Sequence, residues 1–538
     1  MKKIIIQCAF LLSTATWAQW NPSPSTNLPA LSNISYSTMK AIVGSNGRTY
    51  IVAYGDRGSG MVPNFQILNE SGHRRKTQSG SDLLTPPSGT SSIPVPKWDF
   101  QIDLSDDATY LGYTSIAYNY TSYVIKVDSI GDPMWLSTIS IANSKDVKLL
   151  PIGSGQCFLA WTDISTNHGK VQKIGANGSY LWTNPIDIAP STAGWEVVIN
   201  QMHKLQNGDV EVLYAHHNTT SSWGFPYLQK VSNTGNLIWS QPVQLTDQSM
   251  QVAVEGDIQI LGIGDTLYVG LDQSSGGIHQ STLHKVNPDG TLPWSTAGVP
   301  FASTSAFNSS NLHLQYANGD IQCVAEISTS SQFGIAAQKV NPQTGHLPWG
   351  SNGRSVIPMS GSDLILVGME TSSSSRPMIV LGKQLNGYAM PKLLMGVSLD
   401  TAAAIIDSVT IGNSSFTKHY PMVAGIYNDS TITLWGEDRN LHTYAATEVY
   451  AQKSEIGTTY LGQNELAMSL GIYPNPCAGL IQHHGTAPLE NVNISNSQGQ
   501  IVAHKELWIR DTPWNLTSLP SGVYYLQSGI NHSYFYKL

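Results

Sequence analysis

Short runs of alternating apolar and polar residues, separated by Gly, Asn and Pro, fill most of the chain. Such alternation is typical of half-buried β-strands. Asn-Gly pairs precede several of the runs, as at Asn207-Gly208 before VEVLYA and Asn318-Gly319 before IQCVAE, and this pair between apolar runs indicates a β-hairpin. The best candidate for a helix is the short stretch 399–406 (LDTAAAII). The pattern predicts an all-β protein.

A ten-residue motif, K-V-x-x-x-G-x-x-x-W, recurs through the middle of the chain, most clearly as KVNPDGTLPW at 285–294. The glycine is expected to form a turn with φ > 0. The tryptophan is expected to open the next strand and to lie flat between adjacent sheets. By subtraction, the five motif glycines are 47, 57, 55 and 55 residues apart. The glycine and tryptophan positions are Gly131 and Trp135, Gly178 and Trp182, Gly235 and Trp239, Gly290 and Trp294, and Gly345 and Trp349.

A period of about 50 residues, built from short strands and tight turns, is the signature of β-propeller blades. Degenerate copies of the motif flank the clear ones, at 66–72, 382–387 and 452–457. We therefore predict a seven- or eight-bladed β-propeller over residues 19–465.

The first 18 residues have the three parts of a secretory signal peptide. Two lysines precede the apolar run 4–12, and the small-residue site before Gln19 predicts cleavage after Ala18. No later stretch is apolar enough to span a membrane as a helix, so no transmembrane segment is predicted.

From residue 466 to 538 the blade motif is absent, and short alternating runs separated by Pro, Gly and Asn predict a small β-sandwich of immunoglobulin-like type. This segment resembles the type A C-terminal sorting domain of the type IX secretion system of Bacteroidota. The resemblance rests on Tyr473, Pro474, Asn475, Pro476, Gly499, Gly522 and Lys537. It implies export to the outer cell surface or the medium, with the secretion machinery, its sortase and surface lipopolysaccharide as partners.

Composition excludes some classes of function. Charged residues make up 12% of the chain, the formal net charge is −8, and no basic cluster marks a nucleic-acid binder. Cys8 lies in the signal peptide, which leaves an odd number of cysteines and so no disulfide framework. Cys157 and Cys323 are expected to be buried, and Cys477 is not expected to be catalytic. No Cys/His spacing predicts a metal site.

The blade motif also resembles the tryptophan-docking repeats of quinoprotein-like propellers. A quinone site would need a calcium ion and convergent carboxylates. The aspartates Asp56, Asp106, Asp107 and Asp209 are scattered among the units, and we expect them in turns. No cofactor is predicted, and no catalytic motif is present, so the catalytic residues stay unknown.

His216-His217 is followed by Trp223, Phe225 and Tyr227. The histidines are candidates to bind a metal, and the aromatic rings to stack on a sugar. The alternative is a pair of exposed histidines over ordinary core aromatics. Separately, a three-residue D-[ST]-apolar context resembles O-glycosylation sites of Bacteroidota at Ser129, Thr266, Thr401 and Ser408.

Two hypotheses of function follow. The first is a secreted or surface-displayed propeller with a binding, adhesion or scaffold role toward a glycan or protein ligand. The second is an extracellular enzyme that acts on a polysaccharide or glycoprotein, with an active site in the propeller funnel assembled from several blades. Convergent carboxylates in the funnel would favour the enzyme.

Overall fold

A computed structural model represents the chain. It describes residues 20, 24, 27–56, 61–77, 79–83, 98–115, 120–135, 137–189, 194–247, 250–254, 258–275, 278–302, 307–360, 364–372, 376–384, 391–414, 416–438, 447–455, 472–473, 477–483, 489–496, 500–509, 512–528 and 531–538. The described residues form strands and turns and no helix, which confirms the all-β class. The chain divides into two compact units, Met1–Gly457 and Thr458–Leu538. The predicted signal peptide and its cleavage site, Ala18 and Gln19, lie outside the described residues.

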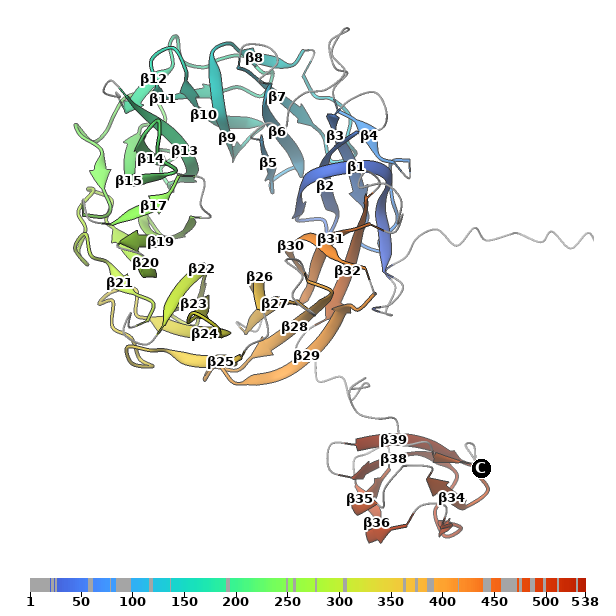
Figure 1. The fold of residues 1–538 in the computed structure, drawn as a ribbon. Coiled ribbons are helices and arrows are strands. Elements are labelled where there is room, and N and C mark those ends of the chain that lie inside the picture. Colours follow the sequence, from blue (N-terminus) through green and yellow to red (C-terminus); the bar gives the residue numbers. More distant parts are fainter. Residues whose placement is uncertain are drawn as a thin grey trace, which may run out of the picture. The chain divides into compact units, whose positions relative to one another are not determined.

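The first unit is a succession of antiparallel four-stranded groups, arranged in chain order around a ring (Figure 1). Within a group, neighbouring strands are joined by short turns, as hairpin chemistry predicts. The first four groups are β1 (Leu28–Val43), β2 (Thr49–Asp56), β3 (Met61–Leu68) and β4 (Ser81–Asp82); β5 (Trp98–Asp103), β6 (Ala108–Ser115), β7 (Thr121–Val127) and β8 (Ile139–Ile141); β9 (Ser144–Gly153), β10 (Gln156–Asp163), β11 (His168–Ile174) and β12 (Ile186–Ala189); β13 (Trp195–Lys204), β14 (Val210–Asn218), β15 (Trp223–Val231) and β16 (Val243–Gln244).

An extra short strand, β17 (Gln251–Ala253), pairs with both β15 and β19 and so joins the fourth group to the fifth. The remaining groups are β18 (Gln259–Ile263), β19 (Thr266–Ser275), β20 (Ile278–Val286) and β21 (Val299–Pro300); β22 (Asn308–Ala317), β23 (Asp320–Ser328), β24 (Phe333–Val340) and β25 (Arg354–Ser360); β26 (Leu364–Thr371), β27 (Pro377–Lys383), β28 (Leu393–Leu399) and β29 (Ile405–Gly412); β30 (Lys418–Tyr427), β31 (Ser430–Asp438) and β32 (Thr447–Glu455).

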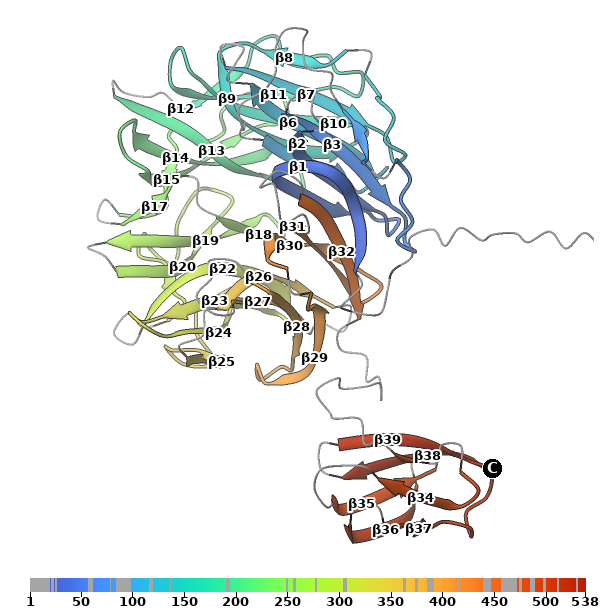
Figure 2. The same ribbon diagram turned by 45° about the vertical axis from the view of Figure 1, so that its right-hand side comes forward.

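The long strand β1 belongs to two groups. Its first residues pair with β32, with Leu28 opposite Ala451, and its last residues pair with β2, with Val43 opposite Thr49. Figures 1 and 2 show β1 beside both strands. The last group thus receives its fourth strand from the start of the described chain, and the two ends of the repeat region are hydrogen-bonded together.

Motif tryptophans lie against the motif glycines of the following group. The backbone angle φ is positive at the glycine, for example +84° at Gly178. A Cβ added to Gly178 would lie 3.2 Å from the Trp135 ring, so glycine leaves room for the ring. The Trp135 indole N–H donates to the Ala176 carbonyl at 2.9 Å. The same arrangement joins Trp182 to Gly235, Trp239 to Gly290 and Trp294 to Gly345.

The tryptophans do not open a strand, as the motif predicted. Trp135 precedes β8, which begins at Ile139, and Trp182 precedes β12, which begins at Ile186. The chain leaves the sheet at this point, because only there can the indole ring reach the turn of the neighbouring group.

Trp20 repeats this contact on the first group. A Cβ added to Gly72 would lie 3.0 Å from the Trp20 ring, and the indole N–H donates to the Glu70 carbonyl at 2.8 Å. The Trp20 backbone N–H donates to the Ser71 carbonyl. Trp20 lies in no copy of the motif, yet it takes the place of a motif tryptophan.

The predicted helix at 399–406 is wrong. Strand β28 ends at Leu399 and β29 begins at Ile405. Between them Asp400 accepts hydrogen bonds from the Ala402 and Ala404 backbone N–H groups, and Ala403 has a φ of +63°. An aspartate that caps a turn and a left-handed residue override the helix propensity of three alanines.

The second unit contains two sheets with a shared core. The strand orders are β33-β34-β37 and β36-β35-β38-β39, all with antiparallel neighbours. Trp508, Phe535 and Leu526 are fully buried in this core. The strands are β33 (Ile472–Tyr473), β34 (Leu480–His483), β35 (Leu489–Ser495), β36 (Ile501–Trp508), β37 (Trp514–Asn515), β38 (Gly522–Ser528) and β39 (Asn531–Lys537).

Candidate ligand-binding rim

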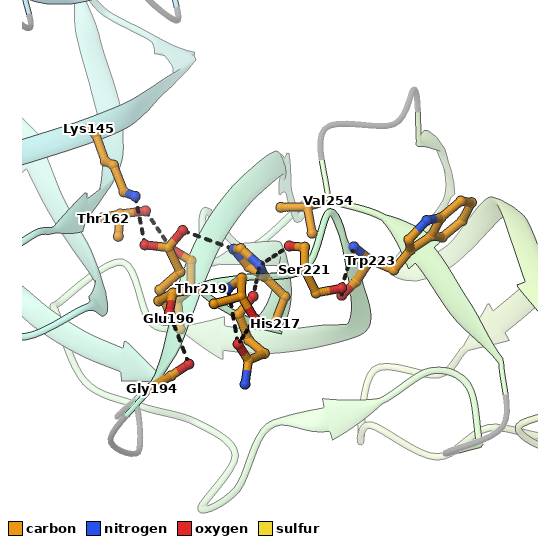
Figure 3. Close-up of polar contacts among 12 residues, drawn as sticks. Lys145, Thr162, Gly194, Glu196, His217, Thr219, Ser221, Trp223 and Val254 are labelled. Atoms are coloured by element: carbon orange, nitrogen blue, oxygen red, sulfur yellow. Dashed lines mark hydrogen bonds and ion pairs between the residues drawn. The ribbon is translucent and has the colours of Figure 1, made fainter.

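Three charged side chains from neighbouring groups meet beside the start of β13 (Figure 3). Glu196 on β13 lies between Lys145 on β9 and His217 on β14. Its Oε2 is 2.6 Å from Lys145 Nζ, and its Oε1 is 3.0 Å from His217 Nε2. The charged triad, Lys145, Glu196 and His217, therefore ties the third group to the fourth.

His217 has acceptors on both sides of its ring. Nδ1 lies 2.8 Å from the carbonyl oxygens of Asn218 and Ser221, while Nε2 faces the Glu196 carboxylate. A neutral imidazole has one N–H and could satisfy only one side. Burial opposes the charged form, but the carboxylate and the carbonyls outweigh it and raise the pKa of His217. The triad then carries two positive charges and one negative charge.

The pKa of Glu196 is held at about 2, chiefly by the hydrogen bond from His217 and also by Lys145, against the effect of burial. The carboxylate is thus ionised at any neutral or mildly acidic pH. All three groups are engaged with one another, so their chemistry is suited to fixing a charged surface rather than to proton transfer.

Half-buried aromatic rings lie next to the triad. Trp195 and Phe225 stack with centroids 6.3 Å apart, and Trp195 contacts the His216 ring at 5.0 Å. Trp223, whose backbone N–H donates to Ser221 Oγ, lies on the other side of His217 (Figure 3). Together Trp195, His216, Phe225, Trp223 and the triad form what we term the aromatic rim.

The two histidines do not act as a pair. Successive side chains of a strand point to opposite faces, and here His216 packs between Trp195 and Tyr227 while His217 faces Glu196. They cannot bind one metal ion together, and His217, 5% exposed, is not a surface residue as the alternative assumed. Across the described residues no group of three or more His, Cys, Asp or Glu is arranged to hold a metal.

The scattered aspartates lie in turns and not at one site. Asp107 accepts from the Ser45 backbone N–H, and Asp209 accepts from the Asn233 backbone N–H. Asp106 caps its own turn through the Ala108 N–H, and the Asp56 side chain lies outside the described residues. The cysteines Cys157, Cys323 and Cys477 are all buried and free.

The predicted modification and sorting residues are distributed over both units. Thr401 and Ser408 are exposed, whereas Ser129 and Thr266 are half-buried. In the second unit Tyr473 lies in β33, Gly522 begins β38 and Lys537 ends β39. Pro474, Asn475, Pro476 and Gly499 lie outside the described residues.

Sequence reasoning found His217, Trp223 and Phe225 but missed Lys145, Trp195 and Glu196. A signal for Glu196 existed, since a carboxylate interrupts the apolar run WEVVI. Its partners come from strands 51 residues upstream and 21 residues downstream by subtraction, and only the folded sheets bring them together.

Comparison with solved structures finds all-β chains of low similarity. An ulvan lyase, a polysaccharide lyase, has 10% sequence identity and a TM-score of 0.41, covering 72% of this chain and 96% of its own. A puromycin hydrolase has 13% identity and a TM-score of 0.40, covering 80% and 63%. Oligopeptidase B from Leishmania major has 10% identity and a TM-score of 0.45, covering 76% and 54%. At these TM-scores the likeness carries no argument about function.

No curated protein matches the sequence. Within the described residues, no helix is long and apolar enough to cross a membrane. Residues 471–537 match the family of secretion system C-terminal sorting domains. The chain is therefore a substrate of that secretion system, exported to the cell surface or secreted.

Proposed function

We propose that this exported protein is an eight-bladed β-propeller that binds a glycan at its aromatic rim, after removal of a signal peptide at Ala18. The four-stranded groups around a ring support the propeller, and the pairing of β1 with β32 supports a count of eight. The immunoglobulin-like sandwich at 466–538 would serve export by the type IX system and its sortase, with attachment to lipopolysaccharide as one outcome. Glycosylation at the exposed Thr401 and Ser408 is part of the same proposal.

The observation that carries the binding role is the combination of stacked, half-buried rings with a fixed charged triad on one rim. Aromatic faces bind the apolar faces of sugars, and a few placed polar groups orient them. Trp195 and Phe225 supply the faces, and the triad supplies the charges.

The test is a screen of the mature protein against polysaccharides and glycoproteins, with binding and product release recorded in the same wells. Truncating Trp223 or Phe225 to Ala should weaken binding about 10- to 100-fold, because losing a buried aromatic contact costs roughly 1.5–3 kcal/mol. Tyr180→Ala is the matched control, since Tyr180 is an aromatic residue with 48% exposure outside the rim.

Equal losses in the control and the rim variants would contradict the proposal, as would the absence of any bound glycan. Product release would instead support the extracellular enzyme. Thermal unfolding of each variant separates lost binding from lost folding.

A further inference from the structure

A cavity of about 420 Å³ lies apart from the aromatic rim, between the seventh and eighth groups. Thr371 and Ser372, at the end of β26, form one side, and Ile426, Asn428 and Asp429, at the end of β30 and in the following turn, form the other. Strands β26 and β30 are tightly packed, because a Cβ added to Gly368 would lie 2.8 Å from the Val423 side chain. The walls are thus held by the packing of two strands.

The turn at Asn428-Asp429 departs from its equivalents in the chain. Strands β30 and β31 are joined by these two residues, with φ values of +49° and +56°. The two-residue turns Ser154-Gly155 and Asn318-Gly319 have the same left-handed conformation, but glycine takes the second place. Glycine is the residue that this conformation favours. Asp429 therefore sacrifices turn geometry and places a carboxylate at the cavity.

The lining has the chemistry of a sugar subsite. It offers two hydroxyls, an amide and a carboxylate beside the apolar Ile426 side chain. Thr371 Oγ1 is buried and has no hydrogen-bond partner among the described residues. A buried hydroxyl without a partner is uncommon and is satisfied when a ligand supplies one. The volume lies at the small end of ligand pockets, which span roughly 300–1,000 Å³.

We propose that this cavity, lined by Thr371, Ser372, Ile426, Asn428 and Asp429, binds one or two residues of a neutral, hydroxyl-rich sugar. The lining contains one carboxylate and no cationic side chain, so it should repel a uronate or sulfated sugar. The site does not depend on the aromatic rim, which lies at the first residues of β9 and β13, whereas this cavity lies at the last residues of β26 and β30.

The probes are methyl glycosides of glucose, galactose, mannose and xylose, titrated into the full mature protein by calorimetry or saturation-transfer NMR. Galacturonic acid and calcium chloride serve as the anionic and cationic comparisons. At least one neutral glycoside should bind, and galacturonic acid should bind at least tenfold more weakly than methyl galactoside.

Asp429→Gly is the decisive variant, because it restores the residue that the turn favours while it removes the carboxylate. Its thermal midpoint should stay equal or rise, and its affinity for the neutral glycoside should fall at least tenfold. Thr371→Val, which keeps the side-chain shape, should also weaken binding and offers a second test should Asp429→Gly fail to fold. Trp223→Ala, in the rim, should leave this affinity unchanged.

Failure of every neutral glycoside to bind would overturn the proposal. So would unchanged affinity in Asp429→Gly, tighter binding of galacturonic acid, or binding of calcium alone. Loss of polysaccharide binding in Trp223→Ala bears only on the rim, so the two proposals fail separately.

Discussion

At the residue scale, Glu211 is a buried acid in a place where the repeats otherwise have an aromatic ring. It lies opposite Lys230, whereas Tyr110 lies opposite Lys126 and Phe158 opposite Lys173. Both oxygens of Glu211 are buried without a hydrogen-bond partner in the described part of the chain. Burial raises the pKa of Glu211 to about 7, against the attraction of Lys230.

This pKa makes stability depend on pH. Between about pH 4.5 and pH 7 the unfolded chain releases the proton while the folded protein keeps it, so stability falls as pH rises through that window. Glu211→Gln should remove this loss, which amounts to about 3 kcal/mol. Urea unfolding of both proteins at pH 5 and pH 8 measures it, with the exposed Glu70→Gln as control. An equal pH dependence in Glu211→Gln and wild type would show that the acid is solvated.

At the scale of elements, the segment from Trp20 to β1 joins the two ends of the repeat region. Trp20 docks on Gly72 of the first group, while Leu28 pairs with Ala451 of the last. The first contact fixes the segment on one side of the junction and the second fixes it on the other. Its ordering is therefore expected to be cooperative with closure of the ring.

Trp20→Ala should destabilise the mature protein by about 1–3 kcal/mol, less than a fully buried tryptophan because this ring is half-buried. Hydrogen exchange should quicken in β1 and β32 before it quickens in β14 or β23, because the loss is local. Tyr180→Ala, an exposed ring elsewhere, is the control. Unchanged exchange in β32 would show that Trp20 does not contribute to closure.

At the scale of the whole molecule, the two compact units separate export from binding. Deletion of residues 469–538 removes the matched sorting domain and leaves the first unit, Met1–Gly457, complete. The truncated protein should accumulate in the periplasm in a folded, protease-resistant form. Cell fractionation and surface proteolysis measure this against the full chain. Normal surface display of the truncated protein would contradict the role of the sorting domain.

Sequence patterns alone determined the strands, the turns and the export. Period-two alternation and Gly and Asn turns are local signals, because hydrogen bonding within a hairpin joins residues close in sequence. The sorting motifs are likewise contiguous. The helix predicted at 399–406 failed because the Asp400 turn is stronger than alanine propensity over so few residues.

Tertiary structure decided the places where function is proposed. The partners of Glu196 and the walls of the Asp429 cavity come from different sheets. Trp20 reaches its glycine from outside any repeat, and β1 pairs with a strand more than 400 residues away, as Leu28 and Ala451 show. No local pattern encodes such contacts, because they arise from packing of whole sheets around a ring. The alternation of the strands fixes which face each side chain takes, but only the assembled sheets decide which side chain it meets.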